Sequence, residues 1–262
     1  MTDTVTTTTD TRGVTTITLN RAKKHNAFDD QMVARLTMTL KKIMANSKTR
    51  VLILAAEGTT FSAGADLDWM KRVGTSRYED NLRDAEALAD MLKTMNEMPL
   101  PTIAKVQGPA FGGALGLISC CDISIATTNA LFAFSEVKIG LIPATISPYI
   151  IEAIGAHKAR HYFMTGETFD ARQAAQLGLI NKVVEETQLN DATAQLIATL
   201  LKNSPAAMCA AKQLAQDVGR NPMSDALIKD TCRRIADVRL SQEGQEGLSA
   251  FLEKRKPSWQ RE

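Results

Sequence analysis

The chain has few cysteines, and none of them forms a metal-binding or redox motif. Only four of the 262 residues are cysteine, with no C-x-x-C pair and no Cys/His cluster at zinc spacing. Cys120 and Cys121 are adjacent within an apolar run, which indicates buried, reduced thiols. We therefore expect no metal site and a reducing, cytoplasmic compartment.

Several other sequence signals are also absent. No run of about 18 apolar residues predicts a membrane span. The net charge of +2 gives no electrostatic reason to expect nucleic acid as a partner. Residues 1–10 are rich in threonine and lack the basic and apolar regions of a secretory signal. The glycines between residues 108 and 116 do not fit G-x-G-x-x-G, and no G-K-[ST] is present, so neither a dinucleotide loop nor a nucleotide-triphosphate loop is supported.

Strand and helix patterns alternate along most of the chain. A period of two, or a short apolar run, predicts strands at residues 14–19, 51–56, 102–106, 122–127 and 180–184. Apolar residues at near-helical spacing predict helices at residues 28–44, 82–95 and 112–121, and residues 72–78 resemble a polar loop. From Leu189 onward only helices are expected, one of them capped by Ser204 with Pro205 at its first position. The pattern predicts an α/β core followed by a helical region.

Two segments place small residues at a turn between a predicted strand and a predicted helix. Phe61–Leu67 follows the strand at 51–56, and Gly108–Gly116 follows the strand at 102–106. Small residues let a ligand approach the backbone, and the first N–H groups of a helix have no internal partner. Two such groups pointing at one spot would form an oxyanion hole, although the glycine cluster alone also fits tight helix packing.

Glu136 is the carboxylate with the most unusual surroundings. It lies between two apolar runs, Leu131–Phe134 and Val137–Ile142. A carboxyl group in such surroundings is either paired structurally or tuned for proton transfer. The three histidines of the chain lie in no nucleophile-elbow or zinc pattern, and we expect none of them to be catalytic.

Ordered motifs along nearly the whole chain resemble those of the crotonase (enoyl-CoA hydratase/isomerase) superfamily. The matching segments are residues 18–21, 26–28, 61–66, 106–113, 121–123, 132–136 with Gly140 and Pro143, 174–178 and 246–256. The resemblance implies a crotonase-type spiral of ββα turns with a C-terminal helical region that trimerises. It divides the chain into an acyl-CoA-binding core, residues 1–188, and an oligomerisation region, residues 189–262. Homotrimers or homohexamers are expected.

The same resemblance implies the site residues and the substrate class. The backbone N–H groups of Ala65 and Gly113 would hold the thioester oxygen of an acyl-CoA, and Glu136 would transfer a proton. No redox cofactor or metal would be required, because coenzyme A is part of the substrate. Residues matching CoA-binding or substrate-binding positions are Ala22, Lys24, Ala27, Ala63, Asp66 and Leu67, with Phe251 and Lys254 reaching the CoA of a neighbouring subunit.

One departure from the family pattern concerns the mechanism. Hydratases of the two-glutamate type carry an acid at the position of Gly116, so Glu136 stands alone here. A single glutamate also resembles the Δ3-Δ2-enoyl-CoA isomerases. Segments 108–117, 135–143 and 146–149 are similar to bacterial methylglutaconyl-CoA hydratases of leucine degradation and to related terpene-pathway hydratases.

We therefore predict a hydro-lyase that converts 3-methylglutaconyl-CoA to 3-hydroxy-3-methylglutaryl-CoA. The alternatives are a general or terpene-pathway enoyl-CoA hydratase and a Δ3-Δ2 isomerase. A non-enzymatic scaffold that binds RNA is disfavoured by the net charge of +2 and the intact oxyanion motif. The distal carboxylate of the substrate needs a cation or hydrogen-bond donors. Lys138, Arg72 and Arg77 are candidates, unless they are merely solvated surface residues.

Overall fold

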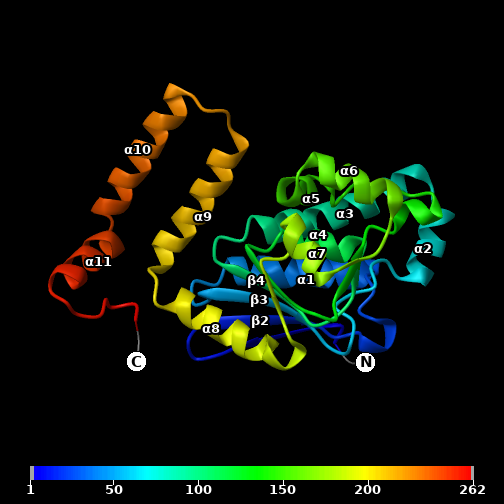
Figure 1. Ribbon diagram of the computed structural model, residues 1–262, viewed down its shortest axis with the longest axis horizontal. Helices are drawn as coiled ribbons and strands as arrows, with labels where there is room; N and C mark the ends of the chain where they lie inside the picture. The colour runs from blue at the N-terminus through cyan, green and yellow to red at the C-terminus, as the bar shows by residue number, and fades with distance from the viewer. Residues whose placement is uncertain (1–2, 261–262) are drawn as a thin grey trace.

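Six strands form the main sheet, in the order β1-β2-β3-β4-β6-β9. The computed structural model describes residues 3–260, and Figure 1 shows a layered α/β core with a helical arm beside it. The edge strand β1 runs antiparallel to β2, and the other neighbours are parallel. The strands are β1 Val5–Thr9, β2 Val14–Leu19, β3 Val51–Ala56, β4 Thr102–Val106, β6 Ile123–Thr127 and β9 Lys182–Val184.

A second, smaller sheet lies next to the first and has the order β5-β7-β8. Its strands are β5 Ala110–Phe111, β7 Leu131–Ala133 and β8 Phe169–Asp170. The chain passes from β4 to β5 and then into α4 (Gly113–Ser119), and from β6 to β7 and then towards α5 (Ser147–Ile154). A main-sheet strand, a small-sheet strand and a helix thus follow one another repeatedly, as the predicted spiral of ββα turns requires.

Helices cover both faces of the main sheet. Successive side chains of β3 point alternately to one face and to the other, and each set packs against helices. Leu52 and Leu54 point into the main core with residues of α1 (Asp30–Met44) and α3 (Tyr78–Asn96). Val51 and Ile53 point to the other face and pack against α8 (Leu189–Leu201) through Ile197. The first helix of the predicted helical region therefore lies against the core, beneath the sheet in Figure 1.

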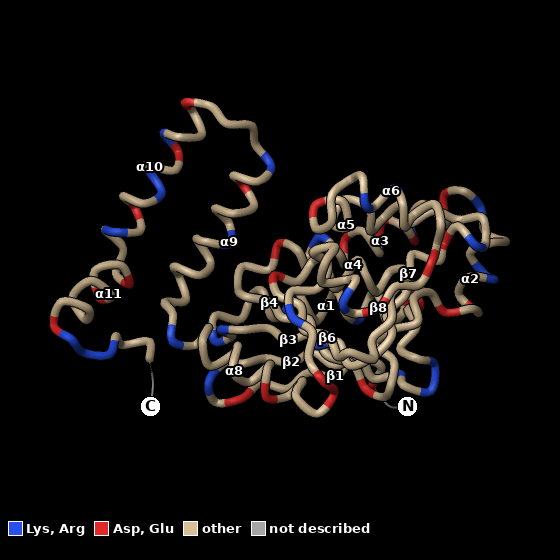
Figure 2. Tube along the Cα trace, in the orientation of Figure 1, with Lys and Arg blue, Asp and Glu red and all other residues tan. Residues whose placement is uncertain are grey.

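The remaining helices form an arm that extends from the core (Figure 1). They are α9 Pro205–Arg220, α10 Asp225–Leu240 and α11 Gln242–Leu252. Ser204 caps α9 as predicted, since its hydroxyl accepts a 3.0 Å hydrogen bond from the N–H of Ala207. Lys212 of α9 pairs with Asp122 at 2.9 Å, which ties the arm to the core. Figure 2 shows both signs of charge along α9 and α10, and neither helix contains a buried residue.

Three parts of the fold differ from the pattern in the sequence. The threonine-rich segment near the start forms β1, whose register places Thr7 opposite Ile17. The polar loop expected at residues 72–78 is shorter than predicted: Arg72 lies within α2 (Leu67–Gly74), α3 begins at Tyr78, and only residues 75–77 connect the two helices. Helix α6 (Ala156–Thr165), which the sequence pattern did not predict, follows α5 directly.

Close packing of α4 on the segment before α5 depends on Gly116. A Cβ atom at this glycine would lie 2.4 Å from Cγ2 of Ile146 and 3.3 Å from Cδ2 of Leu92. Both neighbouring side chains are buried. The space beside Gly116 is therefore filled by an apolar side chain.

We expect Gly116→Ala to destabilise the fold by about 1–3 kcal/mol, because the added methyl group overpacks a buried contact. Gly219→Ala is the matched control, since this helical glycine of α9 has no atom within 4 Å of the Cβ position. That change should stabilise the protein by roughly 0.5–1 kcal/mol. Urea unfolding measures both, and equal stability of Gly116→Ala and the wild type would contradict the packing argument.

Candidate active site

The two predicted turns lie side by side as parallel backbone segments. Ser62 and Ala110 form a parallel bridge, and the N–H of Phe111 donates a 3.0 Å hydrogen bond to the carbonyl of Ser62. Ala65 and Gly113 each lie three residues beyond this bridge, at the same end of the two segments. The structure therefore brings together the two turns that the sequence analysis singled out separately.

The close approach of these turns requires glycine at position 64. A Cβ atom there would lie 2.9 Å from the carbonyl oxygen of Phe111, and the residue has a φ of +85°. Any side chain would collide with the backbone of the second turn and strain its own backbone. Gly64 thus sets the spacing between the segment that carries Ala65 and the segment that carries Gly113.

The N–H groups of Ala65 and Gly113 are both available to a ligand. The carbonyl of Gly64 accepts a 2.7 Å hydrogen bond from Phe28, so the N–H of Ala65 points away from Phe28, since a trans peptide directs the two groups oppositely. Gly113 is the first residue of α4, where the N–H has no helical acceptor. Among residues 3–260, neither group donates a hydrogen bond.

A third parallel segment brings Glu136 to the same place. Strand β7 pairs with β5 in the register Ala110 to Phe132, so the chain after β7 runs out beside the Gly112–Gly113 turn. Glu136 is the first residue of a short 3-10 helix, η2 (Glu136–Ile139). A Cβ atom at Gly112 would lie 3.1 Å from Oε1 of Glu136. The carboxyl group is therefore packed against the residue that precedes Gly113.

The carboxyl group of Glu136 is unusual in its burial and its lack of partners. Its Oε2 atom is buried and has no hydrogen-bond partner in the described part of the chain. Burial raises the pKa of Glu136 above its ordinary value, and a hydrogen bond from its own backbone offsets this only in part. A carboxyl group with a raised pKa beside two unpaired N–H groups can exchange a proton with a bound molecule whose oxygen those groups hold.

The predicted CoA-binding residues of the first turn and of the preceding segment lie next to one another. The N–H of Ala63 donates a 2.9 Å hydrogen bond to the carbonyl of His25, which joins the turn to η1 (Ala22–Lys24). Lys24 is exposed and pairs with Asp68 at 3.1 Å. The remaining members differ in exposure: Ala22 and Leu67 are exposed, whereas Ala27 and Asp66 are buried.

Phe251 and Lys254 lie elsewhere in the chain. Phe251 belongs to α11 and is 81% exposed, and Lys254 follows the helix in an exposed, left-handed conformation. Figure 1 shows α11 at one end of the molecule and α2 at the other. One chain by itself therefore does not bring these two residues to Glu136, and their contact with the CoA of a neighbouring subunit stays a prediction.

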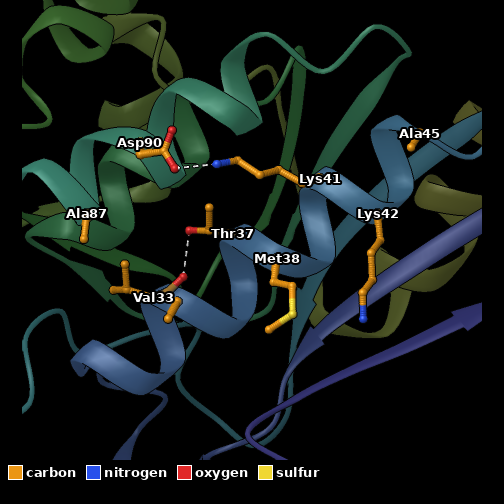
Figure 3. Close-up of a pocket in the computed structure, with 9 residues that line it drawn as sticks. Val33, Thr37, Met38, Lys41, Lys42, Ala45, Ala87 and Asp90 are labelled. Carbon is orange, nitrogen blue, oxygen red and sulfur yellow. Dashed lines mark hydrogen bonds and ion pairs between the residues drawn. The ribbon is translucent and has the colours of Figure 1, made fainter.

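Other features of the surface lie outside this site. A groove of about 550 Å³ runs between α1 and α3, where Lys41 reaches across to Asp90 at 2.8 Å (Figure 3). None of the predicted site residues lines it. Within residues 3–260 there is no cluster of three or more His, Cys, Asp or Glu side chains suited to a metal ion. No helix in that range has the length and apolar character needed to cross a membrane.

Comparison with known proteins decides the family. A family model described as enoyl-CoA hydratase/isomerase matches residues 9–262. The chain belongs to this family. The crystal structure of an enoyl-CoA hydratase from Shewanella pealeana is similar with a TM-score of 0.95 and 44% identity, covering 98% of this chain and 96% of that one. The predicted superfamily and its spiral fold are confirmed.

Relatives in this family carry more than one activity in their names. Human enoyl-CoA hydratase domain-containing protein 3, a mitochondrial protein, is 31% identical over 255 residues, which cover 95% of this chain and 82% of that protein. Hydroxycinnamoyl-CoA hydratase-lyase of Pseudomonas fluorescens is 31% identical over 204 residues, covering 76% and 74%. Membership of the enoyl-CoA hydratase/isomerase family therefore indicates the class of chemistry of this chain, but it does not identify the acyl substrate.

Two contributors to the site were not singled out from the sequence. Ile146 fills the space beside Gly116, and Arg21 contacts the carboxylates of Asp29 and Asp66 at 3.0 Å each. Arg21 lies in one of the matching motifs, so a signal for it was present. No pattern in the sequence indicates that Ile146 and Gly116 meet.

We expect Glu136→Gln to lower kcat by about 10²- to 10⁴-fold, because the nearly isosteric amide cannot exchange a proton. The same change should raise the free energy of unfolding at pH 7. The pKa of Glu136 is raised in the folded state, so the stability contributed by its protonated form is lost as the pH rises through that pKa. Below the unfolded pKa of about 4.3 the two proteins should be equally stable.

Steady-state kinetics and urea unfolding at several pH values test both parts of this expectation. A kcat within threefold of wild type would contradict the role of Glu136. A variant less stable than wild type at pH 7 would show that the carboxyl group is held by partners in the folded state, contrary to its observed surroundings.

Proposed function

We propose that this protein is an acyl-CoA hydratase that adds water to the double bond of 3-methylglutaconyl-CoA, giving 3-hydroxy-3-methylglutaryl-CoA. The observation that carries the proposal is the convergence of three parallel segments at Ala65, Gly113 and Glu136. It supplies two unpaired donors and one partly buried carboxyl group with an unpaired oxygen at a single place. Membership of the enoyl-CoA hydratase/isomerase family supports the same chemistry.

The proposed reaction uses these groups in defined roles. The thioester oxygen accepts hydrogen bonds from the N–H groups of Ala65 and Gly113, which stabilise the negative charge that develops when water attacks the β-carbon. Each such donor contributes roughly 3–4 kcal/mol in other oxyanion holes. Glu136 takes a proton from the attacking water and delivers one to the α-carbon, so that the elements of water are added across the double bond. Water and the acyl-CoA are the only reactants.

A Δ3-Δ2-enoyl-CoA isomerase is the second candidate. It is favoured because Glu136 is the only acidic side chain among the predicted catalytic positions, and because Ile146 fills the space beside Gly116 where a second carboxylate would project. A single carboxyl group is sufficient to move a proton from one carbon to another. The distinction rests on whether water is consumed.

The proposed substrate carries a distal carboxylate, for which three cations were predicted as partners. Arg72 pairs with Asp30 at 2.6 Å, and both side chains are more than half exposed. Arg77 precedes α3 and makes no capping bond there with its side chain. Lys138 follows Glu136 by two residues, with its Cε lying 3.3 Å from the Cβ position of Gly166. Of the three cations, Lys138 is the nearest to Glu136 in the sequence.

We expect kcat/KM for 3-methylglutaconyl-CoA to exceed that for crotonyl-CoA by more than tenfold, equal to about 1.4 kcal/mol of transition-state binding. Mass spectrometry should show a gain of about 18 Da, the mass of one water molecule, in the product. A ratio at or below one would indicate a general or terpene-pathway hydratase. An unchanged mass with a moved double bond would indicate the isomerase.

The helical arm is proposed to assemble the protein as a homotrimer or as a homohexamer. Large apolar side chains of α10 and α11 are exposed, among them Leu240 at 80%, Phe251 at 81% and Leu252 at 77%. Contacts with the arm or the core of neighbouring subunits would remove this surface from water. The same contacts would carry Phe251 and Lys254 to the CoA of a neighbouring subunit. We propose that the assembled enzyme acts in the cytoplasm.

Multi-angle light scattering of the intact protein should give at least three times the 28.5 kDa mass of one chain. Leu240→Asp combined with Phe251→Asp should reduce this mass without unfolding α9, because both side chains are exposed in the single chain. A wild-type protein that is monomeric and fully active at micromolar concentration would contradict the proposed assembly.

A further inference from the structure

We propose that Arg21 is a positioning residue that orients the N–H of Ala65 by bridging the two backbone segments on either side of it. The inference rests on the proposed oxyanion role of Ala65. The side chain of Arg21 is only 20% exposed, although it carries a full charge. Its surroundings therefore have to supply several partners for the guanidinium group.

The guanidinium group contacts three partners through two of its nitrogens. Nη1 donates a 2.8 Å hydrogen bond to the carbonyl of Ala27 and lies 3.0 Å from Oδ2 of Asp29. Nη2 donates a 3.0 Å hydrogen bond to Oδ2 of Asp66. Ala27 and Asp29 flank Phe28 on one segment, and Asp66 follows Ala65 on the other. Phe28 and Ala65 form a parallel bridge, so the two arms of the guanidinium fork contact the neighbours of both bridge residues.

Planar peptide units link the position of the Arg21 guanidinium group to the direction of the Ala65 N–H. The carbonyl of Ala27 and the N–H of Phe28 belong to one peptide unit, so fixing the carbonyl also directs that N–H. The N–H of Phe28 then donates to the carbonyl of Gly64 at 2.7 Å. That carbonyl shares a peptide unit with the N–H of Ala65, which consequently points in the opposite direction. Two hydrogen bonds and two peptide units therefore connect the guanidinium group to the N–H of Ala65.

The second arm of the fork fixes the residue that follows the donor. Asp66 is 4% exposed, and its Oδ1 accepts hydrogen bonds from the N–H groups of Asp68 and Trp69, which caps α2. Burial acts to raise the pKa of Asp66, but these N–H groups and the charges of Arg21 and Lys24 lower it more, so it stays ionised. The N–H of Asp66 also donates to the carbonyl of Phe28 at 2.7 Å.

Arg21 also joins two helix starts, which makes a lysine a poor replacement. Asp29 caps α1 through the N–H of Met32, just as Asp66 caps α2. A guanidinium group reaches both carboxylates and a carbonyl with a rigid fork, whereas an ammonium group is a single point charge. Arg21→Lys should keep the charge balance of the cluster and lose the bridging geometry.

The test measures the carbonyl stretching frequency of a bound enoyl-CoA by difference infrared spectroscopy. In the wild type, two aligned donors should shift this frequency below its value in water. In Arg21→Met we expect a smaller shift, together with a kcat at least tenfold lower and a change in KM of less than threefold. Arg21→Lys should give an intermediate frequency shift and an intermediate kcat. If Arg21→Met fails to fold, the Arg21→Lys protein tests the inference by itself.

Arg35→Met is the matched control. Arg35 lies on α1 and pairs with Asp3 at 2.7 Å in an exposed ion pair, so this variant loses an arginine–aspartate contact away from Ala65. Its carbonyl frequency and kcat should equal those of the wild type. A folded Arg21→Met or Arg21→Lys protein with the wild-type frequency and kcat would overturn the inference, whatever its loss of thermal stability. A wild-type protein that produces no shift would instead refute the oxyanion role of Ala65.

Discussion

The parallel bridge between Ser62 and Ala110 is the contact on which the candidate site depends. It joins two turns that lie far apart in the sequence and sets their register, so that the donor of each turn falls the same number of residues beyond the bridge. The pairing of β5 with β7 adds the third segment in parallel. A shift of one residue in either pairing would move Glu136 or one donor away from the others, since side chains and peptide groups alternate along an extended chain.

The point where these segments meet contains a feature that lowers the stability of the fold. Glu136 is partly buried with an orphan oxygen, and removing that oxygen from water costs free energy. Gly64 and Gly112 have positive φ angles, which glycine adopts without steric strain. Phe134, two residues before Glu136, is fully buried and packs against Phe163 with ring centroids 5.0 Å apart. Buried aromatic packing therefore anchors the backbone that leads to Glu136, whose carboxyl group would by itself prefer water.

The contact between Gly116 and Ile146 gives the absence of a second carboxylate a structural basis. Replacing glycine by glutamate at this position would require Ile146 to move, because the space is already filled. Arg21 lies beside this site as a partly buried charge that contacts the carbonyl of Ala27 and the carboxylate of Asp66. The site thus combines one acidic group, an apolar wall and two backbone donors.

Local sequence patterns by themselves determined much of this protein. The periods of β2, β3 and β4 predict those strands with their observed bounds, and Ser204 with Pro205 predicts the start of α9, because each signal lies within a few residues. The motifs around Ala65, Gly113 and Glu136 indicated the family. Only the tertiary structure decided that α8 covers the sheet, that Ile146 meets Gly116 and that Arg21 bridges two helix caps. These contacts join residues distant in the chain, and no local period encodes which of them will touch.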